Sequence, residues 1–80
     1  MMEHENQYKD QEILAHNLRW LRKKYGYSQK TMAQLLGIGV GSLRKLEYGE
    51  IPLRLTIRFL EPVYVHFRVT PSELLGVRLE

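Results

Sequence analysis

"GYSQKTMAQLLGIGVGSLRKLEYG", residues 26–49, is the stretch that decides the fold. Gly26 can end a preceding helix in the left-handed conformation, and Ser28 is a preferred N-cap for the next helix. Gly37 can end that second helix, and a third helix is expected over about residues 39–48. Two short helices joined by a tight glycine turn predict a helix-turn-helix motif. An ordinary helical hairpin has the same periodicity, so periodicity alone leaves both interpretations open.

Apolar residues recur at helical spacing before, within and after this stretch, beginning with a helix expected over residues 11–25. Up to residue 49 the expected inward-facing side chains are Ile13 or Leu14, Leu18, Leu21, Tyr25, Met32, Ala33, Leu35, Leu36, Ile38, Leu43 and Leu46. Thr56 is expected to open a fourth helix, with an apolar stripe of Ile57, Leu60, Val63 or Tyr64, and Phe67. Pro62 falls within this stripe and should kink or split the helix.

"TPSELLG", residues 70–76, has the start and stop signals of a fifth helix. Thr70 and Glu73 can form a capping box, and Pro71 suits the first helical position. The chain is therefore predicted to be all-α, with about five short helices. Its 80 residues fit one small domain. We expect a flexible N-terminal tail at 1–10, a helix-turn-helix domain at 11–76 and a C-terminal tail at 77–80.

The composition excludes several classes of protein. The absence of cysteine removes disulfide frameworks and thiolate metal sites and suits a reducing cytoplasm. His4, His16 and His66 lie far apart and show no metal-ligand spacing, so neither a metal nor a cofactor is expected. The chain shows no signal-peptide pattern and no apolar run of the ~20 residues that span a bilayer. A soluble, cytoplasmic protein without a membrane partner is the expectation.

The charge is distributed unevenly along the chain. Between Ile13 and Leu46 there are seven basic residues and no Asp or Glu, although the net charge is only +3. Such a surface of one sign is typical of proteins that bind nucleic acids. A solvated helix surface is the alternative, because Lys and Arg are commonly exposed in any case.

The stretch "GYSQKTMAQLLGIGVGSLRKLEYGE" also resembles the helix-turn-helix core of the phage-repressor family, which includes lambda repressor, Cro and the XRE-type regulators. The positions that match in register are Gly26, Ser28, Gln29, Met32, Ala33, Leu36, Gly37, Ile38, Leu43, Leu46, Glu47 and Gly49. The resemblance covers roughly residues 12–76. It implies a lambda-repressor-like DNA-binding domain and a transcription regulator that binds double-stranded DNA, as a homodimer on a palindromic operator.

The resemblance also implies roles for single residues. Ser28 and Gln29 correspond to positions beside the DNA backbone, and Val40, Gly41 and Lys45 to side chains that enter the major groove. Arg22 and Glu47 correspond to an ion pair that ties the first helix to the third. The remaining candidate DNA contacts are Lys30, Ser42, Arg44, Tyr48 and Arg54.

Two of the implied reading positions depart from the family pattern. Gly41 has no side chain with which to read a base, and Val40 offers only an apolar contact to a thymine methyl group. Base reading is therefore expected from Ser42, Arg44 and above all Lys45.

The alternative is a domain with weakened base reading that serves as a protein-interaction module or an antitoxin-like accessory protein. Its partner would bind through Trp20 or the surface of the fourth helix, although packing over the amino-terminal tail is the favoured interpretation of Trp20. A dimer is expected to use the fourth and fifth helices with "VRLE", residues 77–80. No Ser–His–Asp set or carboxylate pair has a spacing that favours catalysis, so an enzyme is not expected.

Overall fold

The structure is a computed structural model. In the part of the chain that it describes, all of the regular secondary structure is helical. The structure describes residues 2–51 and 57–79, and the side chains of residues 11–51 and 57–79. The elements of these residues are α1 (Met2–Lys24), α2 (Gln29–Leu36), α3 (Val40–Glu47), the 3-10 helix η1 (Ile57–Phe59), α4 (Leu60–Phe67) and α5 (Pro71–Gly76). The prediction of an all-α fold with about five helices is confirmed.

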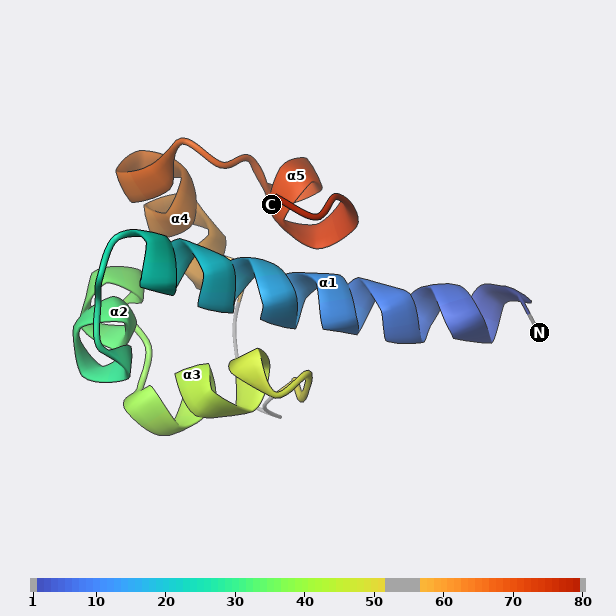
Figure 1. Ribbon diagram of the computed structural model, residues 1–80, viewed down its shortest axis with the longest axis horizontal. Coiled ribbons are helices and arrows are strands. Elements are labelled where there is room, and N and C mark those ends of the chain that lie inside the picture. Colours follow the sequence, from blue (N-terminus) through green and yellow to red (C-terminus); the bar gives the residue numbers. More distant parts are fainter. Residues whose placement is uncertain (1, 52–56, 80) are drawn as a thin grey trace.

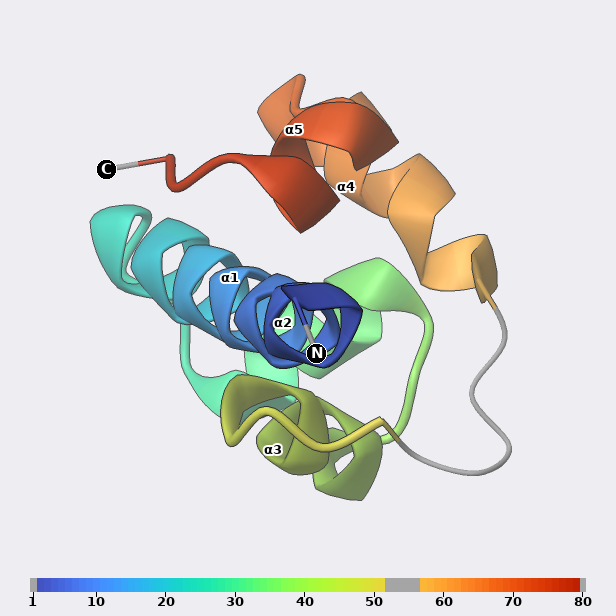
Figure 2. The same ribbon diagram turned by 90° about the vertical axis from the view of Figure 1, so that its right-hand side faces the viewer.

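Helix α1 is the central element of the molecule. It packs against α3 on one side and against α5 on the other, while α2 contacts both α3 and α4. Figures 1 and 2 show this arrangement from two directions, with α1 between the α2–α3 pair and the α4–α5 pair. The helix-turn-helix unit is thus held on one side of a long helix, and the C-terminal helices close the core from the other side.

The first helix starts earlier than its apolar pattern indicates. Its expected start near residue 11 is wrong, because α1 already begins at Met2 and its first turns project beyond the rest of the molecule in Figure 1. The prediction relied on apolar periodicity, which residues 2–10 lack. These residues are nevertheless rich in Glu, Gln and Lys, which are good helix formers at any polar position.

The predicted caps of the helix-turn-helix unit are confirmed. Gly26 and Gly37 both adopt the left-handed conformation, with φ of 72° and 71°. The Ser28 hydroxyl accepts a hydrogen bond from the Thr31 backbone N–H at 3.0 Å, which caps α2. The Gly37 N–H bonds the carbonyl of Gln34 and that of Ile38 bonds Ala33, so the last turn of α2 ends with satisfied carbonyl groups. This turn fixes the entry into α3.

The core contains most of the apolar side chains that the periodicity selects. Those that are buried are Leu14, Leu18, Leu21, Met32, Ala33, Leu36, Leu43, Leu46, Val63 and Phe67, together with Phe59 and Leu74. Leu35 and Ile13 are half-buried, and Ile38 packs against the core from the turn. Tyr25 is exposed, although its ring makes an edge contact with Phe67 at a centroid distance of 5.0 Å.

The fourth helical segment is divided into a 3-10 turn and an α-helix, η1 and α4, instead of one continuous helix. This agrees with the expected disturbance by Pro62, which lies in the first turn of α4 and cannot donate a hydrogen bond to the preceding turn. Ile57 is 78% exposed instead of inward-facing, and Phe59 takes the core position. The 3-10 turn of η1 accounts for this exchange, because three residues per turn present a different set of side chains to the core. The expected helix start at Thr56 lies outside the described residues.

The final helix has the predicted capping box, with Thr70 and Glu73 bonded reciprocally. Residues 77–79, which follow this helix, are tied to α1 by Asn17, whose side chain is fully buried. Asn17 donates to the Leu74 carbonyl at 2.8 Å and the Val77 carbonyl at 2.7 Å, and accepts from the Leu79 N–H at 2.9 Å. The packed unit therefore extends past the expected boundary at residue 76.

Candidate nucleic-acid interface

A buried ion pair connects α1 to the end of α3. Arg22 Nε and Nη2 donate to the two carboxylate oxygens of Glu47, at 2.7 and 3.0 Å. The side chains are 16% and 4% exposed, respectively. The hydrogen bond to Glu47 raises the pKa of Arg22 above its ordinary value, and the nearby carboxylate charge adds to this against the effect of desolvation. The pair expected from the sequence is thus present, and it has the bidentate geometry that Arg and carboxylate favour.

Two further groups of α1 and the following turn complete this junction. Arg22 Nη1 donates to the Tyr27 carbonyl at 3.3 Å, just before the N-cap of α2. Arg19 donates to the backbone carbonyl of Glu47, at the carboxyl end of α3. A cation at this end of a helix is favourable because it faces free carbonyl groups. Arg19 was not among the predicted site residues, although it lies three residues before Arg22 and therefore on the same face of α1.

Gln29 connects the buried pair to the surface. Its Nε2 donates to Glu47 Oε1 at 3.2 Å, and its Oε1 accepts from Arg44 Nε at 3.2 Å. An open polar cleft beside these groups is lined by Arg19, Arg22, Gln29, Glu47 and Tyr48. The sequence indicated Gln29 and Arg44 as separate DNA contacts, and the structure adds that they touch each other.

The start of α2 presents exposed polar groups. Ser28 and Lys30 are exposed and Gln29 is half-buried. The Ser28 hydroxyl is engaged with the Thr31 N–H and hydroxyl, so its first role is structural. Within the described residues, the backbone N–H groups of Gln29 and Lys30 have no partner, as is usual in the first turn of a helix. Such amides, together with the helix dipole, favour an anion such as a phosphate.

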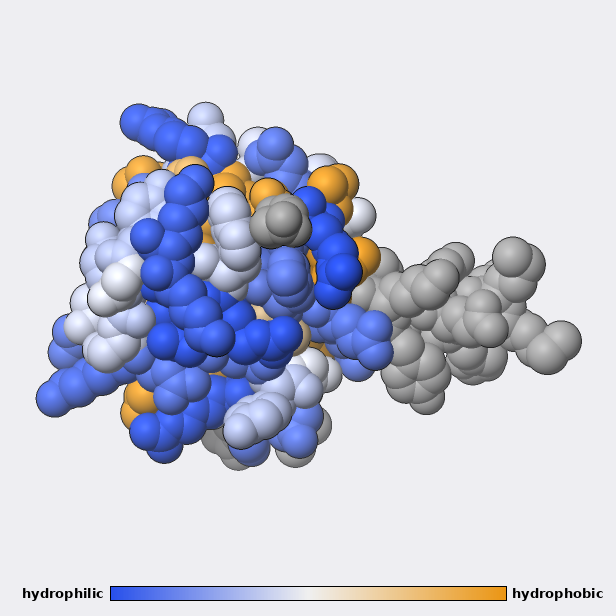
Figure 3. Space-filling view, viewed as in Figure 1, coloured by the Kyte–Doolittle hydropathy of each residue, from blue (hydrophilic) through white to orange (hydrophobic). Residues whose placement is uncertain are grey.

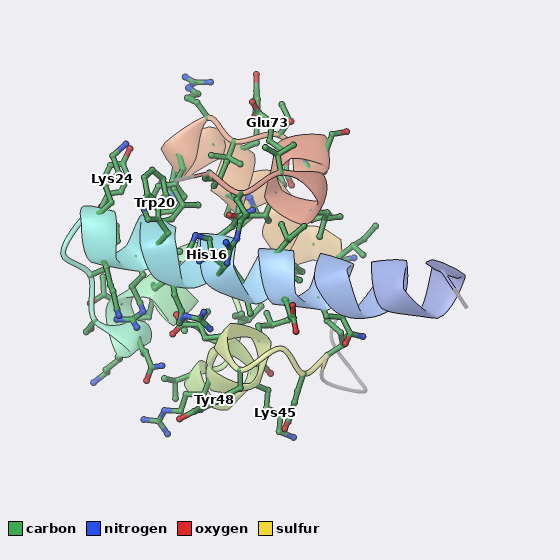
Figure 4. All side chains as sticks on the ribbon, turned by 45° about the vertical axis from the view of Figure 1, so that its right-hand side comes forward. His16, Trp20, Lys24, Lys45, Tyr48 and Glu73 are labelled. Atoms are coloured by element: carbon green, nitrogen blue, oxygen red, sulfur yellow. The ribbon has the colours of Figure 1, made fainter. Side chains whose placement is uncertain are left out.

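The outward face of α3 is made by Gly41, Lys45 and Tyr48. All three are exposed, Tyr48 by 84%, while Leu43, Leu46 and Glu47 are buried on the opposite side. Figure 4 shows Lys45 and Tyr48 on the side of α3 that faces away from α1, and Trp20 and Lys24 on the far side of α1. On the face drawn in Figure 3 the surface over α3 is mostly hydrophilic, and most of the orange, apolar atoms visible in this view lie in its upper part, where Figure 1 places α4 and α5.

Two predicted reading positions are less available than expected. Val40 is not an outward-facing residue, because it is half-buried and packs against the core at the first turn of α3. Ser42 is also half-buried. Arg54, the remaining candidate, lies outside the described residues.

Trp20 is mainly a packing residue. Its ring is partly buried against the core, and Lys24 Nζ lies 4.8 Å from the ring centroid. No helix in the described residues combines the length and the apolar character required to cross a bilayer.

Comparison with known proteins agrees with this geometry. Residues 18–58 match the family model HTH_3, described as helix-turn-helix. The chain is 35% identical over 70 residues to a protein of Pyrococcus furiosus named "Putative HTH-type transcriptional regulatory protein", covering 85% of this chain and 22% of that protein. A protein of Thermococcus kodakarensis with the same description is 38% identical over 64 residues, covering 79% and 20%.

The chain thus spans about a fifth of the length of these curated relatives. No solved structure matches it. The family model covers the junction of α1 with α2, the glycine turn and all of α3, which are the elements that build the candidate interface. From this match and from the observed arrangement of its helices, the chain belongs to the helix-turn-helix family of the XRE/Cro/C1 type.

Proposed function

We propose that this chain is the DNA-binding domain of a transcription regulator, with α3 in the major groove of double-stranded DNA. The observation that carries the proposal is the charge on the exposed face of α2 and α3. Lys30, Arg44 and Lys45 are exposed there, while Glu47, the only acid of the two helices, is buried and neutralised by Arg22. A face with cations and no free carboxylate suits a phosphate backbone.

The contacts in this proposal divide into two groups. Ser28, Gln29 and Lys30 lie at the amino end of α2, where free amides would face a phosphate. On α3, the exposed Gly41 lets the helix approach the groove closely, and Lys45 is the side chain that can reach base edges. Tyr48 would donate to a phosphate beside the end of α3. With few reading side chains, we expect modest sequence discrimination.

A dimer on a palindromic operator is part of the proposal, because a single domain with so few base contacts would bind weakly. Exposed apolar side chains on the C-terminal helices support a dimer surface there. They are Tyr64, Val65, Leu75 and Val77. In Figure 1, α4 and α5 lie across α1 from α3, so a dimer formed through them would leave both reading helices accessible.

The test is a selection of bound DNA from a randomised pool, combined with a salt titration of the binding constant. We expect affinity to fall steeply with salt, with a slope of ~0.9 per phosphate neutralised. Lys30→Ala should lower that slope by ~0.9, the contribution of one phosphate, and should reduce the affinity for all DNA sequences alike. Lys24→Ala removes the same charge from the far side of α1 and is the matched control (Figure 4).

The competing function is a protein-interaction module that uses Trp20 or the surface of α4. The packing of Trp20 against the core makes it the weaker candidate, whereas the exposed Tyr64 and Val65 remain available to a partner. The helix-turn-helix family is typically non-enzymatic, so catalysis is not a third candidate. A protein that retains no DNA even at low salt would contradict our proposal and favour the interaction module.

A further inference from the structure

Arg44 and Lys45 are neighbours on α3, yet they point in different directions. Successive residues of an α-helix are rotated by about 100°, so adjacent side chains are more than a quarter turn apart. Lys45 and Gly41 lie opposite the buried Leu43 and Leu46 and face directly away from the core. Arg44 therefore projects sideways, toward the amino end of α2, and its hydrogen bond to Gln29 confirms that direction.

The orientation of the Gln29 amide is determined by its two partners. The Glu47 carboxylate can only accept hydrogen bonds, and the Arg44 guanidinium can only donate them. The NH₂ group of Gln29 must therefore face Glu47, and its oxygen must face Arg44, at 3.2 Å in each case. A flipped amide would oppose like groups on both sides. Because Glu47 is itself held by Arg22 at 2.7 Å, the chain Arg22–Glu47–Gln29–Arg44 is anchored in the interior.

Lys45 has no such anchor. It makes no side-chain hydrogen bond to any part of the chain that the structure describes, and it is exposed. Its ammonium group sits on a flexible stem that can reach across a groove. The two adjacent cations thus differ in freedom as well as in direction.

We infer that Arg44 is a phosphate-binding residue that Gln29 holds in place, and that base reading on this part of α3 rests on Lys45 alone. The inference rests on the proposed function. It revises the expectation that Arg44 reads bases. It also gives Gln29 a positioning role in addition to any contact of its own with DNA.

The chemistry of Arg44 fits a phosphodiester oxygen. Its Nε is occupied by Gln29, which leaves the four N–H donors of Nη1 and Nη2, and two of these form a planar fork. Such a fork matches phosphate oxygens bidentately. It lies on the same side as the amino end of α2, where the Gln29 and Lys30 amides have no partner within the described residues. A single phosphate group could then receive both sets of donors.

One experiment tests the positioning without DNA. The Nε–H group of Arg44 can be followed by NMR relaxation in the free protein. We expect it to be ordered in the wild type and to fall into the flexible range, with an order parameter below about 0.6, in Gln29→Met. Methionine has a similar length and makes no such hydrogen bonds. An Arg44 Nε–H that is equally mobile in both proteins would overturn the positioning role.

A second experiment measures DNA binding in a double-mutant cycle. We expect Gln29→Met and Arg44→Ala to be coupled, with a combined loss smaller than the product of the single losses by about three- to tenfold. The losses of DNA affinity caused by Gln29→Met and Lys45→Ala should be independent, so that the double variant shows the product of the two. Lys45→Ala is therefore the matched control. Arg44→Ala should lower the salt slope by ~0.9 and leave the preferred sequence unchanged, whereas Lys45→Ala should broaden it.

The outcomes separate this inference from the function on which it depends. The inference is wrong if the wild type binds DNA but the affinity losses of Gln29→Met and Arg44→Ala are independent. It is also wrong if Arg44→Ala changes the preferred DNA sequence. In both cases the proposed function stands. If the wild type retains no DNA at low salt, both are wrong. Unchanged thermal unfolding of Gln29→Met and Arg44→Ala would show that any loss of binding does not arise from a damaged fold.

Discussion

Replacing Arg22 by alanine tests whether this residue holds the fold together or only contacts DNA. In the structure Arg22 donates twice to Glu47 and once to the Tyr27 carbonyl. Arg22→Ala would leave the Glu47 carboxylate, which is 4% exposed, without its counter-charge. Removing one member of a buried pair costs about 3–5 kcal/mol, because the remaining charge stays desolvated.

Two features of the structure reduce this cost. Gln29 still donates to Glu47, and the polar cleft beside the pair is open to water. We therefore expect Arg22→Ala to lower the free energy of unfolding by about 2–3 kcal/mol. For a domain of this size the thermal midpoint should fall by about 10–20 °C. The whole stability of 80 residues is only about 4–12 kcal/mol, so the loss is a large fraction of it.

The assay is thermal unfolding in the absence of DNA. Lys23→Ala, which removes an exposed charge from the adjacent position, is the control and should change stability by less than about 0.5 kcal/mol. The double variant Arg22→Met with Glu47→Leu should be more stable than Arg22→Ala, because no unpaired charge remains. If Arg22→Ala melts like Lys23→Ala but binds DNA poorly, then Arg22 is a DNA contact and the structural assignment is wrong.

The pH dependence of this effect follows from the raised pKa of Arg22. A cation whose pKa is raised on folding contributes its stabilisation at every pH below its ordinary pKa and loses it only as the pH rises through the raised value. Both lie above the working range. We expect the difference in stability between wild type and Arg22→Ala to stay constant from about pH 6 to about pH 9. A difference that shrinks within this range would mean that another titrating group controls the junction.

Three further predictions concern Asn17 and Gly41. Asn17→Leu would leave the Leu74 and Val77 carbonyls and the Leu79 N–H without their partner, so we expect a loss of about 2–4 kcal/mol in urea unfolding; wild-type stability would show that water replaces the side chain. Gly41→Ala should stabilise by about 0.5 kcal/mol, since among the described residues the added Cβ would meet no atom within 4 Å apart from its chain neighbours and the backbone of its own helix. Gly41→Gln should narrow or shift the selected DNA motif, because a base contact is worth about 1–3 kcal/mol; an unchanged motif would mean that residue 41 does not face the bases.

The helices and their ends were predictable from the sequence, since they depend on near neighbours along the chain. Ser28 caps α2 through a hydrogen bond three residues away, and Thr70 does the same for α5. Gly26 and Gly37 end helices because only glycine adopts the left-handed conformation without strain. Most of the core positions before Gly49 followed from helical periodicity, which identifies the residues on one face of a single helix. Tyr25, which is exposed, is an exception.

The family pattern predicted the Arg22–Glu47 pair, but not how that pair connects to the surface. Gln29 and Arg44 are 15 residues apart and belong to different helices, so nothing in their local sequence indicates that they meet. The burial of Val40 was not predictable for a similar reason. Its place on α3 suggested an outward side chain, but it is half-buried and packs against the core.

The C-terminal half depended most on tertiary structure. Periodicity alone could not choose between Ile57 and Phe59, because the 3-10 turn of η1 changes which side chain faces the core. From the sequence, Asn17 looks like an ordinary polar residue of α1. In the structure its side chain is completely buried, with hydrogen bonds to the backbone of α5 and of the residues that follow it. Local hydrogen bonds and helical periodicity depend on residues that are close in the sequence. Which polar groups become buried is decided only when distant segments supply the partners that offset the loss of water.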